Sequence, residues 1–279
     1  MNQFRAVLLS SLFFALLATE LSWAKDPINW KKVSVLVYTK NGKGYVHDNI
    51  PNAVACLQKL GQQHGFKVDV SDQPTVFTEA NLKQYSALIF PSTNNDVFDT
   101  DAQRLAFRRY IEAGGGFVGI HSVMGTERNW AWFKRMIGGT FSWHPPFQKI
   151  RIDVIDSSHP SVQGLPKVWE KEDEFYFAKD MSPGPTVIMA NDLTSLDLNK
   201  EPDKIKQNAG SYTQLYPSVW YYNFDGGHTW CTTLGHHKKD YEDPTYVQHI
   251  FQGIRYVVGQ VNKIDFSKAY ADSRDTPIR

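Results

Sequence analysis

The sequence lacks the features that mark membrane-spanning or nucleic-acid-binding proteins. Lys and Arg together number 30 and Asp and Glu 29, so we expect no broad basic face and no nucleic-acid partner. The longest apolar run, Ala6 to Ala18, is too short for a comfortable bilayer span. The 279 residues, 42% of them hydrophobic, instead fit one large globular domain with a substantial core.

Cysteine is scarce, since the chain contains only Cys56 and Cys231. Neither has metal-ligand spacing or the context of a nucleophile. In an exported protein the two thiols could pair. Cys56 lies in a helical pattern and Cys231 in a strand pattern, however, and this favours two free, buried thiols.

Several motifs of nucleotide and acyl-transfer chemistry are also missing. The chain has no phosphate-binding P-loop, and its GxGxxG match, Gly114 to Gly119, leads into a predicted strand instead of following one, so nucleotide binding has no support. It has no GxSxG either, which argues against serine hydrolysis.

The N-terminus has the pattern of a signal peptide. Arg5 precedes the apolar run, and Ser22-Trp23-Ala24 is a small-x-small cleavage signal. We therefore expect residues 1–24 to be removed and the remaining chain, which has no membrane span, to be exported to the periplasm or beyond the cell.

Strand and helix patterns alternate through the first half of the chain. The β-branched run Val33 to Tyr38 predicts a strand buried on both faces. Further strands are expected at 66–70, 85–90 and 117–120, and helices at 51–64 and 99–113. This alternation predicts an α/β fold of the flavodoxin-like kind, a three-layer sandwich with a mostly parallel central sheet. Ligands of such sheets bind beyond the carboxyl ends of the strands.

The second half has weaker patterns. We expect strands at 150–155 and 186–190, a hairpin over 217–234 and a closing helix over 243–258. Residues 193–211 are polar without periodicity and predict a long surface loop. The polar tail, 260–279, is expected to dock loosely.

Candidate catalytic residues follow the predicted strands and turns. His121 comes directly after a strand and a Gly-rich turn, a place from which a side chain projects into a site. His144 is presented rigidly by two following prolines, and His236 follows a strand. Asp173 and Glu174 could add acid–base groups.

A second group of residues is expected to bind the substrate. These positions follow strands or lie beside the candidate catalytic residues: His47, Thr93, Ser122, Trp143 and Tyr176. Aromatic residues make up 14% of the chain and could stack on sugar rings, although core packing is the better reading for any single Trp. Trp130 and Trp132 could form an interface, but packing of a helix into the core is the preferred interpretation.

The cofactor is left open by the sequence. If His121, His144 and His236 converge with a carboxylate, the set has the ligand types of a divalent metal site, zinc above all. No HxH or HExxH spacing enforces that geometry. Histidines bonded only to one another and to a carboxylate would give the same sequence.

Five segments together resemble the ThuA-like (trehalose-utilisation) family, whose fold is related to class I glutamine amidotransferases. They are VLVYTKNGKGYVHD, YIEAGGGFVGIHS, GGTFSWHP, DEFY and VWYYNFDGGHTWCTTLGH, and the resemblance spans Val33 to Gly259. In amidotransferases the elbow residue is a nucleophilic cysteine. Here it is His121, so the resemblance implies the fold but not glutamine hydrolysis. Many relatives have Arg where this hairpin has His228, so the resemblance makes His228 a further candidate for substrate binding.

The resemblance also implies a role in sugar metabolism. We expect an exported carbohydrate-processing enzyme that acts on a glycoside or an oxidised (keto) sugar through a His and carboxylate site. The alternative is a non-catalytic sugar-binding or complex-forming module. The substrate, the reaction and the oligomeric state do not follow from the sequence.

Overall fold

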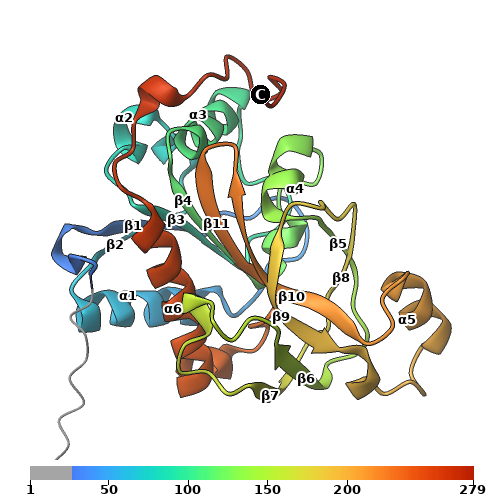
Figure 1. Cartoon of the computed structure of the whole chain (residues 1–279). Helices are drawn as coiled ribbons and strands as arrows, with labels where there is room; N and C mark the ends of the chain where they lie inside the picture. The colour runs from blue at the N-terminus through green and yellow to red at the C-terminus, as the bar shows by residue number, and fades with distance from the viewer. Residues whose placement is uncertain (1–26) are drawn as a thin grey trace, which may run out of the picture.

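A computed structural model describes residues 27–279, in which a nine-stranded sheet is covered by helices on both faces (Figure 1). The signal peptide predicted at 1–24 lies outside the described residues. The sheet order is β2-β1-β3-β4-β11-β10-β9-β6-β7, and β5 and β8 form a separate pair.

The strands are β1 (Ser34–Tyr38), β2 (Lys67–Ser71), β3 (Ala87–Pro91), β4 (Gly116–Ile120), β5 (Thr140–Trp143), β6 (Gln148–Val154), β7 (Val168–Asp173), β8 (Phe177–Lys179), β9 (Thr186–Asp192), β10 (Leu215–Phe224) and β11 (Gly227–Thr232). The helices are α1 (Ile50–His64), α2 (Glu79–Leu82), α3 (Asp101–Glu112), α4 (Ala131–Ile137), α5 (Pro202–Ala209) and α6 (Pro244–Gln260).

The predicted mostly parallel α/β sheet is confirmed. Strands β2, β1, β3, β4 and β11 pair in parallel, whereas β10, β9, β6 and β7 continue the sheet through antiparallel pairs. Following the pair directions across the sheet, only β10 and β6 run against the others. The carboxyl ends of β1, β3, β4, β11 and β7 therefore lie on the same side.

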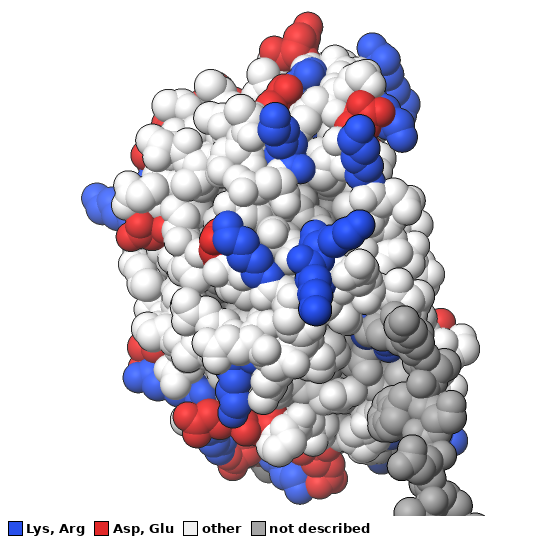
Figure 2. Space-filling model, turned by 90° about the vertical axis from the view of Figure 1, so that its left-hand side faces the viewer, with Lys and Arg blue, Asp and Glu red and all other residues white. Residues whose placement is uncertain are grey.

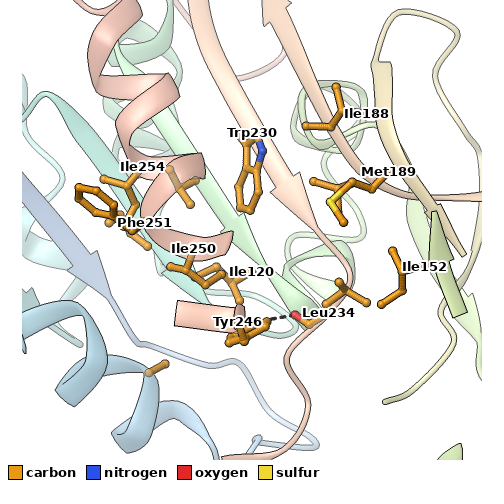
Figure 3. Close-up of a cluster of buried hydrophobic side chains, with 14 of the residues drawn as sticks. Ile120, Ile152, Ile188, Met189, Trp230, Leu234, Tyr246, Ile250, Phe251 and Ile254 are labelled. Atoms are coloured by element: carbon orange, nitrogen blue, oxygen red, sulfur yellow. Dashed lines mark hydrogen bonds between the residues drawn. The ribbon is translucent and has the colours of Figure 1, made fainter. Parts of the chain in front are cut away.

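The central strands bury both of their faces, as the continuous apolar runs predict. In β1, Val35 and Val37 pack into one core with α1 and α6, while Leu36 and Tyr38 pack into a second core with α3 and α4. Neighbouring side chains along a strand point to opposite faces, so one apolar run supplies both cores. Figure 3 shows the first core, where Trp230 of β11 meets α6.

Residues 193–211 were expected to be a loop, but they contain α5. Pro202 lies in the first turn of this helix, and only Ile205 and Ala209 of it are buried. Two apolar residues four apart are too weak a periodic signal to stand out in an otherwise polar segment.

The C-terminal tail is held more firmly than its polar composition predicts. Glu112 of α3 is buried and accepts the backbone N–H groups of Tyr270 (2.9 Å) and Ala271 (3.0 Å). Arg108, also buried, donates to the carbonyl groups of Arg274 (3.1 Å) and Thr276 (2.5 Å). The tail is therefore anchored through its backbone, which side-chain composition does not report.

The surface offers no support for an interface formed by Trp130 and Trp132. Both side chains are buried around α4, as the packing interpretation predicted. Figure 2 shows basic and acidic side chains interspersed on one face, in keeping with the balanced composition. Within residues 27–279, no helix is both long and apolar enough to cross a membrane.

His249 of α6 gives the fold a pH dependence. Burial lowers its pKa to about 3, its Nε2 bonds Thr232, and its Nδ1 is buried with no partner among the described residues. Unfolded histidine has a pKa near 6.5. Below that pH His249 is therefore protonated in the unfolded chain but remains neutral in the folded chain. Stability is therefore lost as pH falls below about 6.5.

We expect His249→Gln to lose less stability on acidification than the wild type. From about pH 6.5 to pH 5 the free energy of unfolding should fall by about 1.6 kcal/mol more in the wild type, since a full proton corresponds to about 1.4 kcal/mol per pH unit and the unfolded histidine is half protonated at pH 6.5. Urea titrations at both pH values measure this difference. Equal losses in both proteins would show that His249 is protonated in the folded state.

Candidate functional site

The carboxyl ends of four strands carry a compact set of polar side chains. His47 lies in the loop after β1, His121 follows β4, Glu174 follows β7 and His236 comes shortly after β11. One ligand atom from each of these four residues lies within 4.8 Å of those of the others. We call this set the His/Glu cluster.

His121 occupies the sharp turn that its sequence context predicts. Its φ angle is +54°, in the left-handed region that side-chain-bearing residues rarely adopt, and a 3₁₀ turn begins at the same residue. Such strained positions persist where the surrounding structure enforces them and are common at functional sites. The turn aims a fully buried imidazole at the cluster.

A backbone contact sets the tautomer of His121. Its Nδ1 lies 2.9 Å from the carbonyl oxygen of Thr233, which can only accept, so Nδ1 carries the proton. Burial, and then the neighbouring His47, hold the pKa of His121 well below its ordinary value. The ring is therefore neutral, with the lone pair of Nε2 facing the cluster. The hydroxyl of Tyr176 donates to this Nε2 atom at 3.0 Å.

His47 is fixed in the same way through Ser122. The Ser122 hydroxyl donates to the carbonyl oxygen of Thr93 (3.1 Å), so its oxygen accepts from Nδ1–H of His47 (3.0 Å). Burial, followed by repulsion from His236, lowers the pKa of His47 to about 4. His47 is thus a second neutral imidazole with a free Nε2 lone pair.

Glu174 and His236 form the charged part of the cluster. Nδ1 of His236 lies 3.1 Å from Glu174 Oε2, and this hydrogen bond raises the pKa of His236. Burial opposes ionisation of Glu174, but the bond from His236 and the other nearby histidines hold its pKa below the ordinary value. The carboxylate is therefore ionised at neutral pH and lies 3.5 Å from Nε2 of His121.

The four donors are of the types that a divalent transition metal requires. Three imidazoles and one carboxylate match the ligands of zinc and its neighbours. The bonds from His121 to Thr233 and from His47 to Ser122 are the outer contacts that orient metal-binding imidazoles. The cluster differs in one member from the set expected from the sequence: it contains His47 and not His144. Nε2 of His144 instead reaches Glu174 Oε1 at 3.4 Å, from a partly exposed position.

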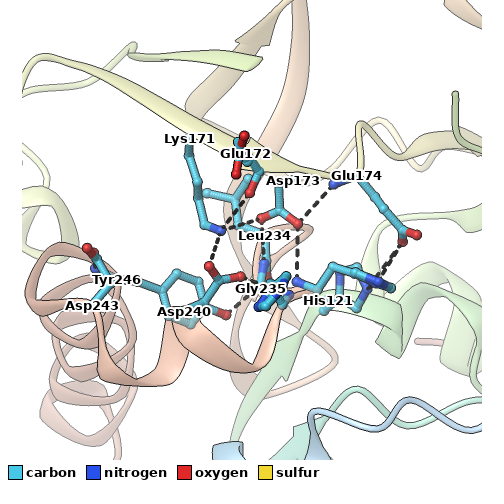
Figure 4. A network of polar contacts seen from close by, with 12 residues as sticks. His121, Lys171, Glu172, Asp173, Glu174, Leu234, Gly235, Asp240, Asp243 and Tyr246 are labelled. Atoms are coloured by element: carbon cyan, nitrogen blue, oxygen red, sulfur yellow. Dashed lines mark hydrogen bonds and ion pairs between the residues drawn. The ribbon is translucent and has the colours of Figure 1, made fainter. Parts of the chain in front are cut away.

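Asp173 is not a member of the cluster, but it supports the cluster through hydrogen bonds to backbone N–H groups (Figure 4). Its fully buried carboxylate accepts the backbone N–H groups of Gly235 (2.8 Å), His236 (3.1 Å) and Glu174 (2.9 Å), and it pairs with Lys171 (3.1 Å). Asp173 was expected to be catalytic. Its lone pairs are engaged by these donors, so it positions the backbone of two cluster residues instead.

The same contact shows how the two halves of the sheet meet. In a flat sheet, β7 would lie four strand spacings from β11, roughly 19 Å away. The 2.8 Å bond from Gly235 to Asp173 therefore requires the antiparallel half to curl toward the parallel half. Gly235 has a φ of +109°, and a Cβ there would lie 1.8 Å from the Tyr246 hydroxyl, so only glycine fits.

A cavity of about 400 Å³ opens beside the cluster. It is lined by Tyr45, His47, Asn94, Ser122, Gly125, Arg128, Phe141, His144, Glu174 and Tyr176. Its size is within the range of small-ligand sites, roughly 300–1,000 Å³. Sequence reasoning missed Tyr45, Asn94 and Phe141, although they lie within three residues of predicted site residues. It also missed Arg128, which has no motif and is held by the Gly125 carbonyl at 3.0 Å.

Three predicted binding residues do not line this cavity. The Thr93 hydroxyl bonds Thr126 (2.8 Å), so its side chain supports the loop. A register shift in β5 separates Trp143 from Phe141, and Trp143 packs on Phe177 instead. His228 bonds Asn223 (2.9 Å) at the amino end of β11, about 13 Å of strand from Thr232. We therefore remove these three from the candidate site.

Both cysteines are free and buried, as predicted. They belong to the two different cores on opposite faces of the sheet. Burial raises the pKa of Cys56 to about 11 and that of Cys231 to about 12, so both remain thiols at neutral pH. Neither can serve as a thiolate nucleophile, and the elbow position that would carry one holds His121.

The fold and the cluster define an α/β protein with a flavodoxin-like sheet and a histidine-rich pocket at the strand carboxyl ends. The chain belongs to the ThuA family, described as trehalose utilisation, whose sequence profile matches residues 34–257. This confirms the family inferred from the sequence motifs and gives a loose link to carbohydrates. No curated protein sequence matches the chain significantly.

Solved structures support the same fold. A ThuA-like protein from Bacteroides uniformis is 23% identical, with a TM-score of 0.68 over 87% of this chain and 96% of that chain. A ThuA-like protein from Parabacteroides merdae is 17% identical, with a TM-score of 0.62 over 86% of this chain and 99% of that chain. A β-galactosidase from Rahnella sp. R3 is similar in 30% of its length (TM-score 0.52, 11% identity, 80% of this chain).

Proposed function

We propose that this protein is an exported, divalent-metal-dependent enzyme that acts on a glycoside or a keto sugar. The observation that carries the proposal is the convergence of His47, His121, His236 and Glu174 within 4.8 Å beside a ligand-sized cavity. The family's link to trehalose utilisation supports the substrate class. The signal-like N-terminus supports export.

The protonation of the cluster supports metal binding over a purely hydrogen-bonded histidine group. His47 and His121 are neutral, and their Nε2 lone pairs lie in the cluster with the ionised Glu174. The lone pair of His121 accepts the Tyr176 hydroxyl, which a bound cation would displace. A divalent cation would satisfy these lone pairs, balance the carboxylate and compete with the proton on His236. Such a cation polarises a carbonyl oxygen or acidifies a bound water.

The chain itself supplies the groups that would bind and protonate a sugar. Burial raises the pKa of Tyr176 well above its ordinary value, so its hydroxyl is a neutral donor. Asn94 and the guanidinium of Arg128 add hydrogen-bond donors to the cavity wall. His144 lines the same cavity in a partly exposed position, with its Nε2 3.4 Å from Glu174, so its ring can hydrogen-bond a sugar hydroxyl.

Metal analysis and turnover assays test the proposal together. Protein lacking residues 1–24, purified without chelator or affinity nickel, should contain about one equivalent of a divalent transition metal or bind one added equivalent of zinc. It should then convert a glycoside or a 3-keto-glycoside, and chelation should abolish conversion. Metal below about a tenth of an equivalent, not restored by zinc, would contradict the metal site. Saccharide binding without any turnover would instead establish a non-catalytic sugar-binding protein.

A further inference from the structure

Exposed apolar side chains lie on two loops that border the His/Glu cluster. Tyr45 is 61% exposed, Val46 53% and Phe147 38%. Tyr45 lines the cavity, and its ring lies 4.8 Å from that of His47. The Phe147 ring lies 5.8 Å from that of His236. Two loops far apart in sequence thus place an aromatic ring beside different members of the His/Glu cluster.

Packing does not account for these two rings. Most aromatic side chains of the described chain are buried in the two cores, whereas Tyr45 and Phe147 give a large part of their surface to water next to a polar pocket. Exposed apolar groups rimmed by polar residues mark binding sites. An aromatic face beside polar groups suits a sugar ring, which has apolar C–H faces and a polar edge.

We propose that Tyr45 and Phe147 form an outer subsite for the second ring of a two-ring glycoside, and this rests on the proposed function. The cavity holds the ring that reacts, next to the His/Glu cluster. The second ring, joined through the glycosidic oxygen, lies outside the cavity against the aromatic rim.

The charges near the rim fit a neutral second ring. Asp48 follows His47 in the same loop as Tyr45, and it pairs with Lys238 at 2.8 Å. The opposite charges of this exposed pair offset one another, so the pair adds no net charge beside the cluster. The cation inside the cavity, Arg128, lies over the ring of Phe141 at 5.6 Å and belongs to the inner wall.

Calorimetric titration with one-ring and two-ring probes tests the subsite. The probes are the two methyl D-glucopyranoside anomers, each with one ring, and trehalose, maltose and cellobiose, each with two. The double variant Tyr45→Ala/Phe147→Ala should lose at least about tenfold in affinity for the disaccharide that binds best, since two stacking rings are removed. Its affinity for the methyl glucosides should fall by a smaller factor, because Tyr45 also lines the cavity. Phe147→Ala alone should leave the affinity for the methyl glucosides within about twofold of the wild type.

Two control variants test whether the loss of affinity depends on the aromatic rings at this position. Tyr212→Ala removes an aromatic residue that is as exposed as Phe147 (39%) but is not among the residues that contact the His/Glu cluster or line this cavity, and it should leave every affinity unchanged. The double variant Tyr45→Phe/Phe147→Tyr keeps both rings and should retain the wild-type affinity for disaccharides. Circular dichroism verifies that each variant is folded.

The possible outcomes separate the subsite from the proposed function. Wild-type protein that binds disaccharides no better than methyl glucosides, or a rim variant that loses both kinds of probe equally or neither, overturns the outer subsite alone. Wild-type protein that binds no saccharide in its metal-loaded form overturns the proposed function and the subsite with it.

Discussion

His121→Asn is expected to lower zinc affinity by at least about 100-fold and to abolish sugar turnover. Loss of an outer contact to a metal ligand typically lowers affinity 10–100-fold, and loss of the ligand itself exceeds that. His121 is the ligand whose geometry is most completely fixed, by the strained turn at φ +54° and by the Thr233 carbonyl. The shorter Asn side chain cannot place a donor atom where Nε2 lies.

Competition with a zinc-binding dye measures this affinity directly, and it does not depend on knowing the substrate. His144→Asn and His228→Asn are matched controls. The first removes a histidine from the cavity rim and should reduce turnover while zinc affinity stays within about threefold. The second removes a histidine at the opposite end of β11 and should change neither. Zinc affinity unchanged in His121→Asn would remove His121 from the metal site.

The fold followed from the sequence because its signals are local. The run Val33 to Tyr38 reads as a doubly buried strand without knowledge of the rest of the chain, and each strand–helix alternation restricts the topology further. His121 could be predicted for the same reason, since its strand and its Gly-rich turn are adjacent to it in sequence. Family motifs added confirmation over almost the whole domain.

The composition of the site could be predicted only in part because it depends on contacts between distant segments. The presence of His47 rather than His144 in the His/Glu cluster depends on the bond from His47 to Ser122, 75 residues away. The role of Asp173 rests on the curl that brings β7 to Gly235. Neither contact produces a periodic pattern or a motif spacing in the sequence. The sequence therefore shows only that a histidine or an acidic residue lies in a loop, not which residues it contacts. His228 was misplaced because adjacency to a family motif does not show which end of a strand a residue occupies.

The second large effect concerns stability: Glu112→Ala should lower the free energy of unfolding by about 3–5 kcal/mol. Arg108 and Glu112 pair at 2.8 Å, and both side chains are almost fully buried. Removing one partner of a buried pair leaves the other charge inadequately compensated, which costs about that much. Asp225, 3.6 Å from Arg108, offsets only part of the loss. The substitution also strips the acceptor from the N–H groups of Tyr270 and Ala271.

Urea unfolding measures the loss, and amide hydrogen exchange locates it. Exchange at Tyr270 and Ala271 should accelerate more than exchange in β4 or α6, because the tail loses its anchor while the cores remain packed. Glu170→Ala serves as the control, since Glu170 pairs with Lys149 on the exposed surface, and it should leave the midpoint unchanged within error. A loss below about 1 kcal/mol in Glu112→Ala, with tail exchange unaltered, would mean that the buried pair does not anchor residues 269–276. The firm docking of the tail would then rest on its remaining contacts, chiefly those of Arg109 with the carbonyl groups of Ala269 and Ala271.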